Sequence, residues 1–548
     1  MAKARNIEIP LPEDRGLRYR LFEILPGALT WIIITSPAWL GFLNVRLVAG
    51  LMLAFLMLWF VRAIALNVRG VQSWRMLERH KKIDWQELLH DVSLQQKGEP
   101  VTRQKPDWHP RNLRRIADTP NGINPDNIIH AVIIATYNET REVIEPTIQA
   151  VLDSHYDMKK IVLLLAYEER GGPEVEAQAK KIMSDYKGKF LYAAAIKHPD
   201  KMPNEVRGKG GNITFAGREL AEWVRKKNID PAHVMVTTLD SDNRPDRGFL
   251  ACVSYVYSVC HDPKYLSFQP IPMFTNNIWD APAPMRVIAT GNSYWMMVQA
   301  LRPHMLRNFS AHAQPLHALI ETDFWSTRTI VEDGHQFWRS YFAFGGRHEV
   351  VPIFLPIYQD AVLANGYVKT LKAQFIQVRR WAWGASDIAF VAEKGFFSGD
   401  KRLNRFDVWA KFLRVLEGHI SWSSSPLILA FGASVPFLFH NTDYLANQLP
   451  QLASRIQTIA MLGIFVTLYM SFKILPPKPL RYKRHRSVFM VLQWVLLPVT
   501  TIVYSSCAAI YSQTRLMFGN YIGGFDVTEK AVKTDSGMAT SLKDGKQS

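Results

Sequence analysis

The residues His233 to Asp242, HVMVTTLDSD, are the strongest indication of the fold of this chain. In it, a short apolar run rich in branched residues ends at two aspartates one residue apart. Three similar runs, IIHAVIIA, KIVLLLAY and KFLYAAAI, precede it between residues 128 and 196, and helical patterns lie between them. Buried parallel strands joined by helices give this alternation. We therefore expect a mixed, mostly parallel α/β sheet that binds its ligands at the carboxyl ends of the strands.

Apolar segments flank this block on both sides. Residues 24–45 and 47–61 are typical of a transmembrane hairpin, and residues 420–439 and 456–475 of two further spans, because a span needs about 20 mostly apolar residues. Lys and Arg cluster before residue 24, between 69 and 82, and between 478 and 486. Positive charge favours the cytoplasmic side, so we expect a multi-pass plasma (inner) membrane protein whose α/β block is cytoplasmic. Pro498 interrupts the apolar run 488–511, for which we favour a re-entrant or interfacial course, or a tight hairpin, over one full crossing.

These boundaries divide the chain into eight parts. They are a cytoplasmic leader (1–23), a transmembrane hairpin (24–66), a linker or collar (67–127), a cytoplasmic catalytic domain (128–350), interfacial helices with the QVRRW motif (351–415), a C-terminal transmembrane region (416–515), a loop with the FDVTEK motif (516–531) and a disordered tail (532–548).

The composition agrees with a membrane protein. Of the 548 residues, 48% are hydrophobic and 16 are Trp, and the formal net charge is +17. The chain lacks a finger, repeat or RNA-binding signature, and its basic clusters lie beside the apolar segments. The charge therefore indicates a lipid bilayer as partner and not a nucleic acid. The three cysteines, Cys252, Cys260 and Cys507, have neither metal-ligand spacing nor a disulfide pattern.

Two motifs are suited to binding a substrate that carries negatively charged phosphate groups. Asp240 and Asp242 lie on the same side of a strand end, where two hard oxygen ligands suit Mg²⁺ or Mn²⁺ carrying a diphosphate. In RGKGGN, Lys209 and the start of a helix are expected to face a phosphate, although a simple turn before a helix explains this motif equally well.

Two further motifs are suited to the acceptor side. Asp333, in VEDG, opens a predicted helix, either as a helix cap or as a general base toward a hydroxyl. Gln377, Arg380 and Trp381, in QVRRW, share one helix face by their spacing. Arg suits phosphate oxygens and Trp a sugar ring, whereas an amphipathic helix at headgroup depth is the alternative that we favour for Arg379 and Trp383.

Taken together, these motifs resemble the membrane-embedded family 2 glycosyltransferases of the cellulose, chitin and hyaluronan synthase type. The resemblance covers about residues 20–531. Six motifs carry it in order: TYNE (136–139), the Lys of GKGGN, DSD, EDG, QVRRW, and FDVTEK (525–530), which is similar to a gating loop of bacterial cellulose synthase.

The resemblance implies a GT-A fold and inverting transfer from a nucleotide sugar, with UDP as the expected nucleotide. It implies that Asp333 is the general base. It also implies that Asp240 contacts the donor, that Asp242 binds the metal with Asp240 beside it, and that the remaining site residues bind substrate. These are Thr136, Tyr137, Glu139, Glu168, Lys209, Glu332, Gln377, Arg380, Trp381, Thr528 and Lys530. It also points loosely to Gly291–Ser293 as an acceptor-side loop.

The chain departs from the family pattern at two points. AYEER, with Glu168 and Glu169, stands where the family often has an Asp pair that contacts the base, and Val331 replaces the Thr of the Thr-Glu-Asp motif. The expected acceptor is a growing β-linked polysaccharide that is threaded through the spans. The alternatives are a lipid-linked acceptor without processive synthesis, and a non-catalytic transporter or scaffold, against which the intact motifs argue.

Overall fold

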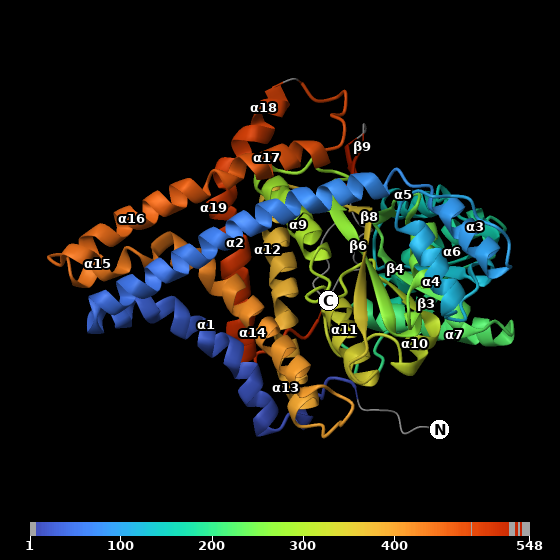
Figure 1. The fold of residues 1–548 in the computed structure, drawn as a ribbon, viewed down its shortest axis with the longest axis horizontal. Helices are drawn as coiled ribbons and strands as arrows, with labels where there is room; N and C mark the ends of the chain where they lie inside the picture. Colours follow the sequence, from blue (N-terminus) through green and yellow to red (C-terminus); the bar gives the residue numbers. More distant parts are fainter. Residues whose placement is uncertain (1–6, 484, 525–531, 535–536, 540–548) are drawn as a thin grey trace.

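The computed structural model describes residues 7–483, 485–524, 532–534 and 537–539. A mixed, mostly parallel α/β sheet forms its centre, and long apolar helices from both ends of the chain extend away from the sheet on one side (Figure 1). The predicted fold class is therefore confirmed. The FDVTEK motif, with Thr528 and Lys530, lies outside the described residues.

The eight-stranded sheet has the order β3-β2-β1-β4-β7-β6-β8-β5. Its pairs β1–β2, β1–β4, β2–β3 and β6–β8 are parallel, whereas β7 pairs antiparallel with β4 and β6, and β5 antiparallel with β8. The strands are β1 Ile129–Thr136, β2 Ile161–Glu168, β3 Tyr192–His198, β4 Val234–Asp240, β5 Arg244–Pro245, β6 Leu266–Phe274, β7 Ala313–Pro315 and β8 Glu349–Gln359. A separate hairpin pairs β9 (Val532–Thr534) with β10 (Gly537–Ala539).

The alternation of side chains along the strands builds two cores. Val132 and Ile134 of β1 face one helical layer, and Ala131 and Ile133 face the other. The first layer contains α3 (Trp85–Gln96), α4 (His109–Asp118), α5 (Arg141–Leu152), α6 (Gly172–Asp185) and α8 (Phe249–Val259). The second contains α7 (Lys209–Lys226) and α10 (Leu316–Glu321). The predicted collar thus includes two helices, α3 and α4, that belong to the core of the sheet domain.

Further helices connect the sheet to the apolar region. They are α9 (Ala283–Ala300), α11 (Glu332–Ala343), α12 (Tyr367–Ala382) and α13 (Asp387–Phe396). The sheet itself extends past the expected boundary at residue 350, because β8 pairs with β6 along its length. Gly291–Ser293 lie within α9 and not in a loop, which corrects the looser of our expectations: ATGNSYW continues an apolar helical face packed on β6.

In the part of the chain that the structure describes, four helices are long and apolar enough to cross a membrane. They are α1 (Leu17–Leu43), α2 (Val45–His80), the run Tyr444–Ile474 formed by α16 (Tyr444–Ala460) and α17 (Gly463–Ile474), and the run Arg486–Met517. A tight turn joins the first two: Asn44 Oδ1 accepts hydrogen bonds from the backbone N–H groups of Arg46 and Leu47 and caps α2.

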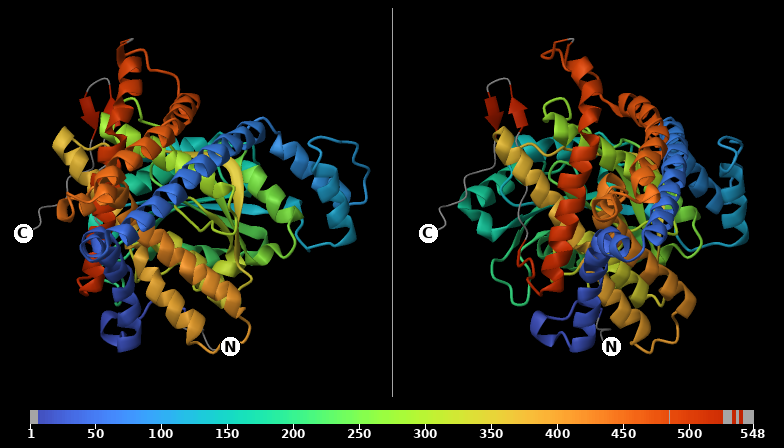
Figure 2. Two further views of the ribbon diagram at one scale, coloured as in Figure 1. Left: turned by 60° about the vertical axis from the view of Figure 1, so that its left-hand side comes forward. Right: turned by 90° about the vertical axis from the view of Figure 1, so that its left-hand side faces the viewer.

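The segment expected to span at 420–439 is also helical, although it is not among these four. It consists of the end of α14 (Arg405–Leu427), a π-helical stretch (Ile428–Gly432) and α15 (Val435–Phe439). The rings of Phe42 and Phe439, at the tips of two helical hairpins, lie 6.5 Å apart. Figures 1 and 2 show these tips together, far from the sheet.

The run Arg486–Met517 takes a different direction. It contains α18 (His485–Leu492), α19 (Leu497–Thr500), a π-helical stretch (Thr501–Ser506) and α20 (Cys507–Met517). Near its start, Arg486 donates to the carbonyl of Trp279 at 2.8 Å, and at its end the carbonyl of Met517 accepts from Arg20 at 3.1 Å. Both ends therefore contact elements at the base of the helical hairpins, and neither lies at their tips.

Candidate functional site

The motif residues of three strands meet at one edge of the sheet. β1 lies between β2 and β4, and the register pairs Thr136 with Tyr167 and Ala135 with Asp240. TYNE, YEER and DSD therefore follow neighbouring strand ends. The carboxyl edge of the parallel part of the sheet is where an open α/β sheet binds its ligands.

Glu139 joins two of these strand ends. Its Oε2 accepts hydrogen bonds from the Thr136 hydroxyl and the Tyr137 N–H, both at 2.8 Å, and its Oε1 accepts one from the Ser241 hydroxyl at 3.0 Å. The side chain is buried. Glu139 and Thr136 thus hold the turn after β1 against the turn after β4. Because both side chains are buried, they support the site from within the sheet domain.

Glu168 borders a pocket at the end of β2. It forms an ion pair with Arg170, whose guanidinium lies 4.3 Å from the centroid of the Tyr137 ring. The pocket holds about 130 Å³ and is otherwise lined mainly by His198 at the end of β3 and by the loop from there to α7, which includes Arg207. Tyr137 and Glu168, expected at the nucleotide, thus lie close together.

Lys209 and Asp240 form the charged centre of the site. Lys209 Nζ donates to Asp240 Oδ1 at 2.7 Å, and the Ser310 hydroxyl donates to Asp240 Oδ2 at 2.6 Å. Burial alone would lower the pKa of Lys209, but Asp240 and Glu332 raise it above its ordinary value, so the amine stays protonated. No local pattern in the sequence marks Ser310, because it reaches Asp240 from a loop 70 residues away.

The glycines after Lys209 allow this approach. A Cβ on Gly210 would lie 2.3 Å from the carbonyl oxygen of Ser326 and 3.2 Å from Cβ of Glu332. A larger residue would therefore push the start of α7 away from α11. RGKGGN is thus a close-packed helix start that brings Lys209 to the acidic residues.

Asp242 is the second carboxylate of DSD and is buried. Its Oδ2 accepts from the backbone N–H of Asp360 at 3.0 Å, and its carbonyl oxygen accepts from Asn276 at 2.9 Å. Among the described residues, no group of three or more His, Cys, Asp or Glu side chains could hold a metal ion. Mg²⁺ often takes only one or two carboxylates plus substrate phosphates, and the Asp240–Asp242 pair fits that mode of binding.

Glu332 and Asp333 begin α11, as predicted, and face the same centre. Asp333 Oδ1 accepts a hydrogen bond at 2.7 Å from the N–H of the next residue, Gly334, within the first turn of the helix. Burial raises the pKa of both carboxyl groups, while the positive charge of Lys209 lowers both and that of Arg380 lowers Asp333. The net shift is upward for each, the direction that suits a general base near neutral pH.

The QVRRW motif lies near the end of α12 and reaches the site from the helical region. Trp381 packs its ring 6.2 Å from that of Phe274, at the end of β6. Gln377 accepts a hydrogen bond from Gln374 at 3.1 Å. Arg379, in contrast, lies 5.6 Å from the Tyr511 ring, against α20. Arg379 therefore packs against α20, whereas Arg380 lies near Asp333.

The C-terminal chain returns to the site just before FDVTEK. Gly524 forms a parallel bridge with Arg207, two residues before Lys209. The predicted roles of Thr528 and Lys530 stay predictions.

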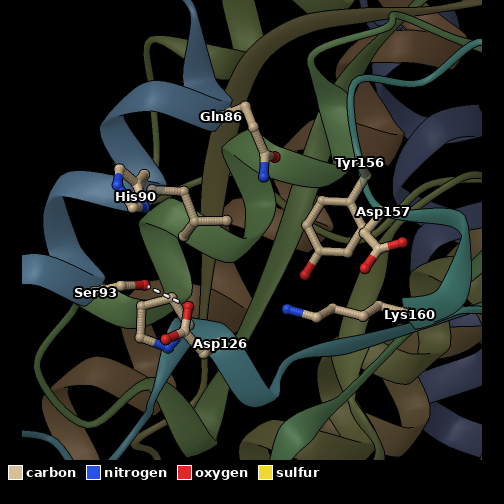
Figure 3. Close-up of a pocket in the computed structure, with 9 residues that line it drawn as sticks. Gln86, His90, Ser93, Asp126, Tyr156, Asp157 and Lys160 are labelled. Carbon is tan, nitrogen blue, oxygen red and sulfur yellow. Dashed lines mark hydrogen bonds between the residues drawn. The ribbon is translucent and has the colours of Figure 1, made fainter.

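A second small pocket lies at the opposite edge of the sheet. It holds about 70 Å³, and among the residues that line it are Gln86 and Ser93 of α3, Asp126 before β1 and Lys160 before β2 (Figure 3). Because it borders the amino ends of the strands, it is separate from the motif residues.

Comparison with known proteins gives only distant likenesses. No protein-family model matches the chain, and no curated protein matches it. A mannosyltransferase, PcManGT from Pyrobaculum calidifontis in complex with GDP-Man and Mn²⁺, is 14% identical with a TM-score of 0.40, over 71% of this chain and 98% of that one. S. aureus TarS 1-349 in complex with UDP-GlcNAc is 10% identical with a TM-score of 0.33, over 77% and 98%. Neither likeness is strong enough to assign a function to this chain.

Proposed function

We propose that this protein is a membrane glycosyltransferase that moves a sugar from a nucleotide donor, expected to be UDP, onto a growing β-linked polysaccharide at the cytoplasmic membrane face. The observation that carries the proposal is that charged residues from several elements lie close together. Lys209, Asp240 and the Glu332–Asp333 pair lie together at the carboxyl edge of the sheet, and Arg380 of α12 lies near enough to lower the pKa of Asp333. Asp242 follows Asp240 by two residues at the same strand end. A metal-dependent transfer from a diphosphate donor needs this combination of charges.

In the proposed reaction, the acceptor hydroxyl oxygen bonds to the anomeric carbon of the donor sugar while the bond from that carbon to the diphosphate oxygen breaks. Asp333 takes the hydroxyl proton, and the bonding electron pair leaves with the nucleoside diphosphate. This direct displacement inverts the configuration of the anomeric carbon. Lys209 and Arg380 would offset the negative charge that grows on the leaving group. Mg²⁺ or Mn²⁺, held by Asp242 with Asp240 beside it, would supply further neutralisation of that charge.

Trp381 would provide the flat apolar surface for the acceptor sugar. Its ring packs against that of Phe274 at the end of β6, which places it beside the strand ends. Gln377 and Arg380 lie on the same helix and would hold the diphosphate, and the loop with Thr528 and Lys530 would close over the donor.

We also propose that the helices α1, α2, α14–α15 and α16–α17 cross the bilayer and that the run Arg486–Met517 lies along its cytoplasmic face. Its two ends contact the base of the hairpins, which supports this arrangement. Tags provide the test. A tag inserted at Asn441 should be reached from outside intact cells, whereas one after Ser548 should not. External labelling at Ser548 would contradict the proposed course.

Donor turnover tests the activity itself. Purified protein in lipid, supplied with Mn²⁺ or Mg²⁺ and single UDP- or GDP-sugars, should release nucleoside diphosphate from one or two donors in step with sugar incorporation. Metal-independent release, or release without incorporation in the presence of acceptor, would contradict the proposal.

A further inference from the structure

The N-terminal leader reaches across to the helix that carries Asp333. Ile9 is buried in an apolar cluster with Ile330, Val331 and Phe337. Arg328 donates to the carbonyl oxygen of Ile9 at 3.1 Å. The leader thus packs on the turn that immediately precedes Glu332.

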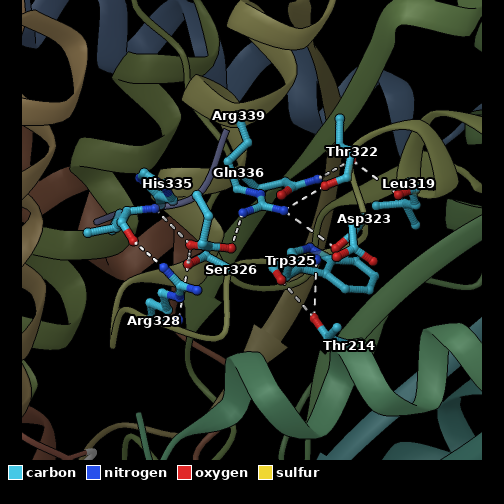
Figure 4. Close-up of polar contacts among 12 residues, drawn as sticks. Thr214, Leu319, Thr322, Asp323, Trp325, Ser326, Arg328, His335, Gln336 and Arg339 are labelled. Atoms are coloured by element: carbon cyan, nitrogen blue, oxygen red, sulfur yellow. Dashed lines mark hydrogen bonds and ion pairs between the residues drawn. The ribbon is translucent and has the colours of Figure 1, made fainter. Parts of the chain in front are cut away.

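Glu8 is the polar centre of this contact. Its Oε1 accepts hydrogen bonds from the Ser326 hydroxyl and, at 3.0 Å, from the Ile9 N–H, and its Oε2 forms an ion pair with Arg339. The Arg339 side chain is only 2% exposed and also donates to the carbonyl of Thr322 at 2.6 Å. Figure 4 shows Arg339, Ser326 and Thr322 gathered in this network.

The two partners of Glu8 lie on either side of the acidic pair. Ser326 belongs to the turn before Glu332, and Arg339 lies two helical turns into α11. One carboxylate therefore fixes both the entry to the helix and its body. Because Arg339 is buried, loss of Glu8 would leave a charge without its counter-ion, which is strongly unfavourable.

Ser326 also connects the leader to Lys209. Its carbonyl oxygen occupies the space that a Cβ on Gly210 would take, and the neighbouring Thr327 carbonyl accepts from the Val206 N–H at 2.8 Å. A displacement of the turn that holds Ser326 would therefore be felt at the start of α7 as well as at the start of α11.

We propose that Glu8 is a positioning residue for the transfer reaction: through Ser326 and Arg339 it holds the turn 322–331 so that Asp333 and Lys209 keep their mutual placement. This inference rests on the proposed function, because it takes Asp333 as the base.

The test compares Glu8→Ala with two control variants. The first, Glu13→Ala, changes an exposed residue of the same leader. The second, Asp91→Asn, changes a buried carboxylate that pairs with His109 in the layer of α3 and α4. In Glu8→Ala, kcat should fall by about 10- to 100-fold, the cost of misplacing a reacting group by about 1 Å, with a smaller change in the donor KM. Glu13→Ala should keep the wild-type kcat, and Asp91→Asn should lower the melting temperature without the loss of kcat.

The double variant Glu8→Ala/Arg339→Met separates positioning from stability. It removes the unpaired charge, so the melting temperature should recover while kcat stays low. A kcat that recovers together with the melting temperature, or a wild-type kcat in Glu8→Ala, would overturn the inference.

Hydrogen exchange gives a readout that does not depend on turnover. Amides of residues 326–334 and 209–212 should exchange faster in Glu8→Ala than in Glu13→Ala, and unchanged exchange would overturn the inference. If the wild-type protein transfers no sugar from any donor, the proposed function fails, and the exchange experiment alone then decides whether Glu8 fixes this turn.

Discussion

Replacement of Asp333 by Asn removes the proposed base with little change of shape. Asn retains an oxygen that can accept from the Gly334 N–H, so the start of α11 should be preserved. Loss of a general base costs about 10²- to 10⁴-fold in rate. Since each factor of ten is about 1.4 kcal/mol, the barrier should rise by about 3–5 kcal/mol.

The assay is single-turnover transfer of radiolabelled sugar by protein in lipid, with donor affinity measured separately on the same sample. Asp333→Asn should bind the donor as the wild type does and transfer it at the reduced rate. Asp323→Asn is the matched control, because Asp323 precedes the same helix, is 73% exposed and pairs only at the surface with Arg218. A wild-type rate in Asp333→Asn would refute the assignment of the base.

Three further outcomes are expected. Lys209→Met removes the cation that lowers the pKa of Glu332 and Asp333. Because the base must be unprotonated, the acidic limb of the pH profile of kcat/KM should move to higher pH. An unmoved limb would contradict this electrostatic coupling. Asp242→Asn should raise the Mn²⁺ concentration for half-maximal activity on the order of tenfold or more, and removal of metal by EDTA should abolish transfer reversibly; full activity in EDTA would argue against a metal. Trp381→Ala should shorten the product more than it slows hydrolysis of the donor, and a product of wild-type length would separate this ring from the acceptor.

The strand ends were the part of the site that could be predicted from the sequence. A buried parallel strand leaves an unmistakable apolar run, and the residue that follows it lies at the ligand-binding edge, so Thr136, Glu168 and Asp240 could be placed together. The start of α11 at Glu332 was equally readable, because an acidic pair before a helical pattern is a local signal.

Other features depend on contacts between distant segments. Ser310 on Asp240 and Glu8 on Arg339 join residues 70 and 331 positions apart, which no local pattern records. The α4 helix was missed because HPRNLRRIAD is mostly polar and buries only His109, Leu113 and Ile116. Gly291–Ser293 were expected in a loop only through the resemblance to the synthase family, whereas packing on β6 keeps them helical.

The length of the product tests the central claim most directly. Protein in lipid should be incubated with metal and the radiolabelled donor that turns over, and the product should be resolved by size and by extraction into organic solvent. We expect a long, water-soluble polymer that is absent from Asp333→Asn. A short, organic-extractable product would contradict processive synthesis and identify a lipid-linked acceptor, and no incorporation from any donor would contradict sugar transfer by this site.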